Sequence, residues 1–104
     1  MDPYIEQIRL SIELSFIKRR IKQILEDVEQ IFTASIALNI LKGQTNQYLS
    51  DQQKAELTEL LNELEQKSEA KKPKLEQLWA RRDTIRNRLQ ELGPEGAWRG
   101  FDSE

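Results

Sequence analysis

The sequence predicts an all-α protein, and three observations support this class. Apolar side chains recur at alternating steps of four and three residues over 10–38, which is the seven-residue repeat of helices that pack against helices. The same alternation runs through 57–92. The 104 residues include only four glycines and three prolines, so few positions interrupt a helix. We therefore expect long helices that bury one another's apolar stripes.

The first helix is expected to run from about Pro3 to Lys42. Asp2 can accept hydrogen bonds from free backbone N–H groups, and Pro3 loses no hydrogen bond in a first turn. Gly43 after Lys42 is a typical helix stop, because glycine tolerates a positive φ. The predicted partner interface is the main stripe of this helix, which Ser35 interrupts once. Its apolar members are Leu10, Leu14, Ile17, Ile21, Ile24, Val28, Ile31 and Leu38.

The first helix also carries a second apolar set outside the main stripe. Its members are Ile5, Ile8, Ile12, Phe16, Leu25, Phe32, Ile36, Ile40 and Leu41. A simple two-stranded seam needs only one stripe per helix. The wider face therefore predicts that this helix contacts at least two other helices.

The second half of the chain contains one ambiguous residue, Pro73. Ser50 and Gln53 match a capping box and predict a helix start at that point. The apolar repeat continues past Pro73, which favours one long helix, but Ser68 and Lys71 are polar at stripe positions beside it. Two architectures remain open: a long antiparallel coiled-coil helical hairpin kinked near Pro73, or a three-helix bundle if the chain breaks there.

The helical part is expected to end at Leu92, because Gly93 and Pro94 follow it. We expect one helical domain over 1–93, which suits the length of the chain, and an irregular tail over 94–104.

The tail holds large apolar side chains in a glycine-rich setting. Trp98 and Phe101 stand on either side of Arg99 and Gly100. Two interpretations are open. The aromatic side chains fold back over the end of the bundle, or Trp98, Arg99 and Phe101 form a short anchor that inserts into a partner's groove.

Charge is distributed unevenly, although the net charge is only −2. Residues 43–70 hold six acids and two bases, a net −4, and residues 71–92 hold seven bases and three acids, a net +4. The candidate anion-binding residues are Lys18, Arg19, Arg20, Lys22, Arg81, Arg82 and Arg86. These bases either pair with acids and solvate the surface, or they bind an anionic ligand such as nucleic acid.

The residue types argue against catalysis. The chain has no cysteine and no histidine, so it lacks disulfides, thiolate metal sites and the usual acid–base groups. We expect no catalytic residue, no metal ligand and no cofactor. The longest strongly apolar run, 31–41, is far shorter than the roughly 20 residues that cross a bilayer. With no recognisable secretory signal, we expect no membrane span and a cytoplasmic location.

These observations predict a non-enzymatic adaptor or scaffold protein that acts through helical coiled-coil association. The expected partners are a second copy of the chain, in a homodimer, and another protein. The alternative is a small helical nucleic-acid-binding subunit that uses the basic clusters near 18–22 and 71–88.

Overall fold

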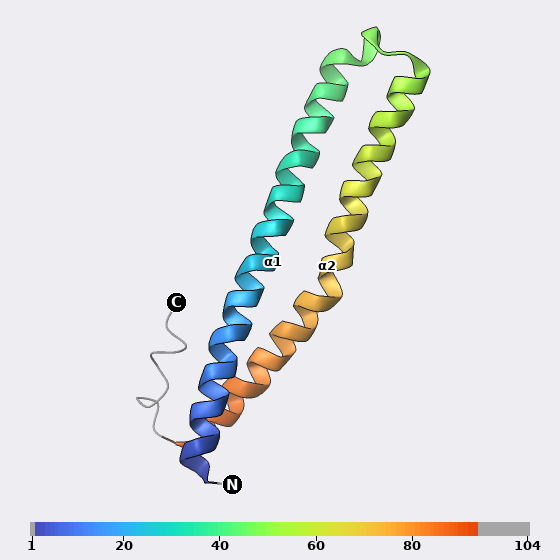
Figure 1. Cartoon of the computed structure of the whole chain (residues 1–104). Helices are drawn as coiled ribbons and strands as arrows, with labels where there is room; N and C mark the ends of the chain where they lie inside the picture. Colours follow the sequence, from blue (N-terminus) through green and yellow to red (C-terminus); the bar gives the residue numbers. More distant parts are fainter. Residues whose placement is uncertain (1, 94–104) are drawn as a thin grey trace. The chain divides into compact units, whose positions relative to one another are not determined.

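The computed structural model describes residues 2–93, which form two long α-helices joined by a short turn (Figure 1). Helix α1 spans Pro3–Thr45, the 3₁₀ helix η1 spans Asn46–Tyr48, and helix α2 spans Asp51–Leu92. No strand occurs within residues 2–93. The all-α prediction is confirmed, and α2 ends at Leu92 as expected.

Local side-chain capping starts both helices as the sequence predicts. The Asp2 carboxylate accepts a hydrogen bond of 2.8 Å from the backbone N–H of Tyr4. At the start of α2, the backbone N–H of Gln53 donates to Ser50 Oγ at 3.2 Å, and the backbone N–H of Ser50 donates to Gln53 Oε1 at 3.0 Å. The second arrangement is a complete capping box, which satisfies two backbone donors that the first turn leaves free.

The predicted stop at Lys42 and Gly43 is wrong, because α1 continues to Thr45. Gly43 does not adopt a positive φ, so its conformational freedom is not used to end the helix. The chain instead leaves the helical path through η1 and then Leu49, whose φ of −93° and ψ of 142° are extended. A glycine in the last turns of a helix lowers its stability by only about 1 kcal/mol, which continued helical hydrogen bonding can offset.

Helix α2 passes through Pro73 as one element, so the three-helix bundle is wrong. Proline removes one backbone donor and crowds the preceding turn, but the turns on both sides stay helical. The polar stripe residues near it, Ser68 and Lys71, are half-buried, as are the apolar stripe residues Leu57, Leu61 and Leu64 before them. The periodicity across the proline was therefore the better guide to the structure.

The contacts of the chain divide it into two compact units. Within the described residues, unit 1 consists of 2–23 and 74–93, and unit 2 consists of 24–73. Each unit pairs one segment of α1 with one segment of α2. The single domain expected over 1–93 stays a prediction.

Burial differs sharply between the two units. The buried apolar side chains of unit 1 are Leu14, Ile17, Ile21, Leu75, Ile85 and Leu89. Gln7 and Ser11 are also buried there, and the Ser11 hydroxyl donates to the Gln7 carbonyl at 2.8 Å. Within the described residues of unit 2, Ile24 alone is a buried apolar side chain. Unit 1 has a closed core, and unit 2 does not.

Replacing Pro73 by alanine should stabilise the protein. Pro73 lies inside α2 and its side chain is exposed, so the variant restores a backbone donor without opening a cavity. Proline is about 3 kcal/mol less favourable than alanine inside a helix, and its stiffening of the unfolded chain returns up to about 1 kcal/mol, so we expect a gain of roughly 2 kcal/mol. Thermal unfolding followed by circular dichroism measures it, with Lys74→Ala as a control expected to change little. An unchanged or lower Tm for the Pro73 variant contradicts the prediction.

Candidate functional site

The main stripe of α1 is distributed between the two units. Four of its members are buried within the chain: Leu14, Ile17, Ile21 and Ile24. Its other members are half-buried: Leu10, Val28, Ile31, Ser35 and Leu38. In unit 1 the stripe is therefore largely covered by the chain itself, whereas in unit 2 much of its surface still faces solvent.

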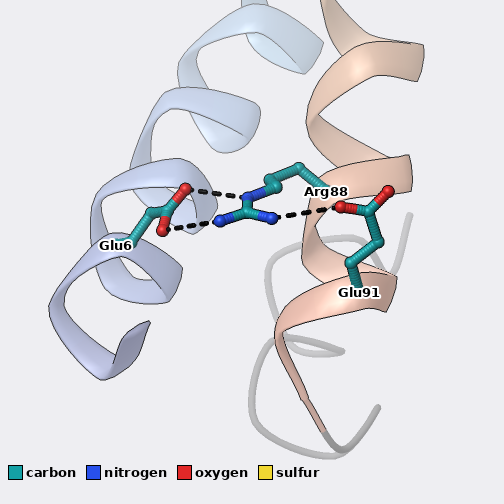
Figure 2. A network of polar contacts seen from close by, with 3 residues as sticks. All are labelled: Glu6, Arg88 and Glu91. Carbon is teal, nitrogen blue, oxygen red and sulfur yellow. Dashed lines mark hydrogen bonds and ion pairs between the residues drawn. The ribbon is translucent and has the colours of Figure 1, made fainter. Parts of the chain in front are cut away.

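In unit 1, two arginine–glutamate pairs join α1 to α2. Arg88 donates through Nε and Nη2 to the two carboxylate oxygens of Glu6, at 2.9 and 3.1 Å. Arg81 makes the same two-point contact with Glu13, at 2.8 and 2.9 Å. Figure 2 shows the Arg88 guanidinium between Glu6 and Glu91, which accepts a third hydrogen bond of 3.1 Å.

The spacing of these pairs fixes the register of unit 1. Glu6 and Glu13 are seven residues apart, and so are Arg81 and Arg88. As the residue number rises along α1 it falls along α2, so the two segments run antiparallel. Charges that flank an apolar seam at heptad spacing select partner and orientation. A slip by one residue would break both two-point contacts.

The same contacts shift the protonation of the paired groups. The hydrogen bond from Arg88 lowers the pKa of Glu6, and the hydrogen bond from Arg81 lowers the pKa of Glu13, with attraction between the opposite charges adding to each effect. Desolvation raises the pKa of both glutamates; this effect is smaller than that of the hydrogen bond and larger than that of the charge attraction. The pKa values of Arg81 and Arg88 are raised by the same glutamates. Both pairs are therefore fully charged near neutral pH.

These pairs bear directly on the candidate anion-binding residues. Arg81 is bound to Glu13, and Arg82 lies 3.3 Å from Asp83. Lys18 and Arg86 are half-buried and make further interactions. Arg19, Arg20 and Lys22 are exposed, as Arg81 is, and these three lie on the α1 segment of unit 1. Arg81, like Arg88, therefore pairs with a carboxylate of the other helix, which is the first of the two roles left open for these bases. Glu6 and Glu13 were not identified from the sequence, because their partners lie 82 and 68 residues away.

In unit 2, α1 and α2 border an open groove of about 600 Å³. Its apolar lining comes from Leu25, Val28, Ile31, Phe32 and Leu61. Three carboxylates also line it: Glu29 from α1, and Glu65 and Glu69 from α2. Ser35, Asn39 and Ser68 complete the lining. The sequence does not single out Glu29, Glu65 and Glu69, because their place in the groove depends on which faces of the two helices meet.

The pairing of the two helices in unit 2 is polar and loose. Lys71 Nζ lies 3.7 Å from the Asp27 carboxylate, and Lys42 Nζ donates to Thr58 Oγ1 at 3.0 Å. Both contacts involve exposed or half-buried groups, which contribute at most about 1 kcal/mol each. The two-point pairs of unit 1 have no counterpart among the hydrogen bonds described for residues 24–73. Little besides partial apolar contact holds this pair of segments together.

The second apolar set of α1 is exposed along its whole length. The most exposed of its residues are Phe16 and Phe32, at 63% and 64%. The remaining members, all between 41% and 57% exposed, are Ile5, Ile8, Ile12, Leu25, Ile36, Ile40 and Leu41. No segment of the described chain buries this face. The additional helices that the sequence predicts against it are not supplied by residues 2–93.

Other predicted features have simpler outcomes. The candidate anchor residues Trp98, Arg99 and Phe101 lie outside the described residues. Across residues 2–93, no helix combines the length and apolar character that a membrane crossing requires. In the same residues, no cluster of three or more acidic side chains is arranged to hold a metal ion.

Comparisons with models of known protein families, with curated proteins and with solved structures found no match to this chain. Its function is therefore inferred from its residues and their arrangement alone.

The arginine–glutamate pairs should make stability depend on pH in the acid range. Because the folded state lowers the pKa of Glu6 and Glu13 below 4.5, the unfolded chain binds more protons as pH falls, and the free energy of unfolding decreases. Denaturant titrations measure the free energy of unfolding. Between about pH 5.5 and pH 3, it should fall further for the natural chain than for the double variant Glu6→Gln/Glu13→Gln.

Glu59→Gln/Glu63→Gln provides the matched control for this comparison, since both residues are exposed and belong to unit 2. Its pH profile should follow that of the natural chain. Equal decreases in all three proteins would show that the pairs do not stabilise the fold.

Proposed function

We propose that this chain is a non-enzymatic interaction protein that acts through helical, coiled-coil-type association. The proposal rests on one observation: unit 2 leaves its apolar surface uncovered. Its stripe residues are half-buried, and five exposed apolar residues of α1 lie beside them, namely Leu25, Phe32, Ile36, Ile40 and Leu41. Leu60 of α2 is 46% exposed as well.

The exposed apolar area supports an association surface rather than incidental exposure. A phenylalanine that is nearly two-thirds exposed presents on the order of 100 Å² of apolar surface. With the neighbouring aliphatic side chains, the face of unit 2 reaches several hundred Å², the size that marks functional patches on soluble proteins. Burying such area stabilises a complex by roughly 25 cal/mol per Å² before the costs of association.

A helix is the partner element that fits this surface best. The groove lies between two helices, and an amphipathic helix fills such a groove with side chains three, four and seven residues apart. Leu25 and Phe32 are seven residues apart, and Phe32, Ile36 and Ile40 follow at intervals of four. A helix that occupies the groove would turn the open two-helix segment into a three- or four-helix layer with an interior.

Nucleic-acid binding receives less support. Two of the seven candidate bases, Arg81 and Arg82, already have carboxylate partners, and neutralising a phosphate would require them to exchange one anion for another. The exposed apolar residues of α1 have no role in that alternative.

Introducing charge into the uncovered face should abolish association without unfolding the chain. The tagged natural chain is purified from its own cells together with its partner. We expect Phe32→Glu/Ile36→Glu to co-purify at least tenfold less of that partner, because burying an unpaired carboxylate in the interface costs several kcal/mol. Co-purification quantified by mass spectrometry, with untagged copies of the chain counted as a partner, measures the effect.

Gln30→Glu/Thr33→Glu is the matched control, since it adds the same charge at exposed polar positions of the same helix that are not part of the second apolar set. It should retain the partner, and far-UV circular dichroism should show both variants equally helical. The proposal fails if the natural chain enriches no protein over the tag alone, or if the Phe32/Ile36 variant retains its partner.

A further inference from the structure

The two units carry opposite charge. Within the described residues, unit 1 holds ten bases and six acids, a net +4. Unit 2 holds nine acids and five bases, a net −4. The ion pairs described above lie inside one unit or the other, so they leave each net charge in place. Two copies of this chain therefore attract each other when unit 1 of one meets unit 2 of the other.

Unit 1 offers an apolar strip with basic residues along it. The strip consists of the exposed residues Ile5, Ile8, Ile12 and Phe16 at intervals of three and four. Arg19 continues the same spacing, and Arg9 follows Ile8 directly. Both arginines are exposed, and neither makes an ion pair with another described residue. The strip thus combines apolar area with positive charge that the fold does not use.

Unit 2 offers the complementary surface. The lining of its groove includes apolar side chains, among them Phe32 from α1 and Leu61 from α2, together with three carboxylates. Glu69 is engaged by Lys72 at 2.8 Å. Glu29 and Glu65 are exposed, and within the described residues neither has an ion-pair partner. This groove accepts an apolar helix face only if the helix brings positive charge with it.

We propose that the occupant of the unit 2 groove is the apolar strip of a second copy of this chain, with Arg9 and Arg19 of that copy facing Glu29 and Glu65. The inference rests on the proposed function and names the partner for it. Each copy carries both the strip and the groove, so two copies of the same chain supply both sides of the contact. The chain's own tail is a poorer occupant, because 94–104 holds three acids and one base, the same sign as the groove.

Charge exchange between two variants provides the test. Purified chains are examined by sedimentation equilibrium from about 1 to 200 µM, a range that covers ordinary dimer affinities. The natural chain should self-associate. Each of two double variants should do so at least tenfold more weakly: the strip variant Arg9→Glu/Arg19→Glu and the groove variant Glu29→Lys/Glu65→Lys. An equimolar mixture of the two variants should recover the natural affinity, because every contact in the mixed pair then joins opposite charges. Arg9→Gln/Arg19→Gln, which removes charge without reversing it, should weaken association less.

Glu59→Lys/Glu63→Lys is the control for the groove variant, since it reverses the same number of charges in unit 2 away from the groove. It should associate as the natural chain does. The proposal is overturned if the natural chain is monomeric throughout, if mixing restores nothing, or if the control weakens association equally. A monomeric natural chain that still captures a different protein through Phe32 and Ile36 overturns the second-copy assignment and leaves the proposed function standing. Capture of no protein at all contradicts both.

Discussion

A pair of helices can bury one stripe of each helix, and α1 carries more apolar surface than one stripe holds. In unit 1 the main stripe is covered by Leu75, Ile85 and Leu89 of α2, yet Phe16 remains 63% exposed on another side of the same helix. Adding contacts between α1 and α2 cannot cover that side, because a helix packs against one neighbour over only part of its circumference. Within residues 2–93, the exposed apolar area thus follows from having two helices, and a further helix would cover it.

The same constraint has different results in the two units because their seams differ in composition. Unit 1 joins leucine and isoleucine on both helices and secures the register with two-point arginine–glutamate contacts. In unit 2 the seam includes Ser35, Ser68 and Lys71, which provide little apolar area and have polar groups to satisfy. Ser35 returns its hydroxyl to the Ile31 carbonyl at 3.0 Å instead of contributing to packing between helices. A seam built in this way closes incompletely and leaves a groove.

Patterns among neighbouring residues predicted the two helices and their starts. The features that they did not predict depend on contacts between residues far apart in the sequence. The Asp2 and Ser50 caps were predictable because the bonding groups lie within three residues of each other. The end of α1 could not be predicted from Gly43, because glycine permits a positive φ without requiring one. Continuity through Pro73 was indicated by the apolar repeat on both sides of it but not decided, because Pro73 itself and the polar residues Ser68 and Lys71 favoured a break. The partners of Arg81 and Arg88 lie 68 and 82 residues away, so only the register of the folded unit identifies them.

Charges in this protein fall into two groups, and the distinction bears on the candidate site. Arginines that flank the buried seam of unit 1 are held by carboxylates of the other helix, and such contacts determine which faces meet. Arg9 and Arg19 lie beside apolar side chains that nothing in the described chain covers, as do Glu29 and Glu65 at the groove. On both units, charge without an ion-pair partner among residues 2–93 lies next to uncovered apolar surface. This combination suits an interface, because apolar burial supplies affinity and charge supplies orientation. We therefore propose two separate tasks for α1: its buried stripe forms the fold, and its exposed residues serve association.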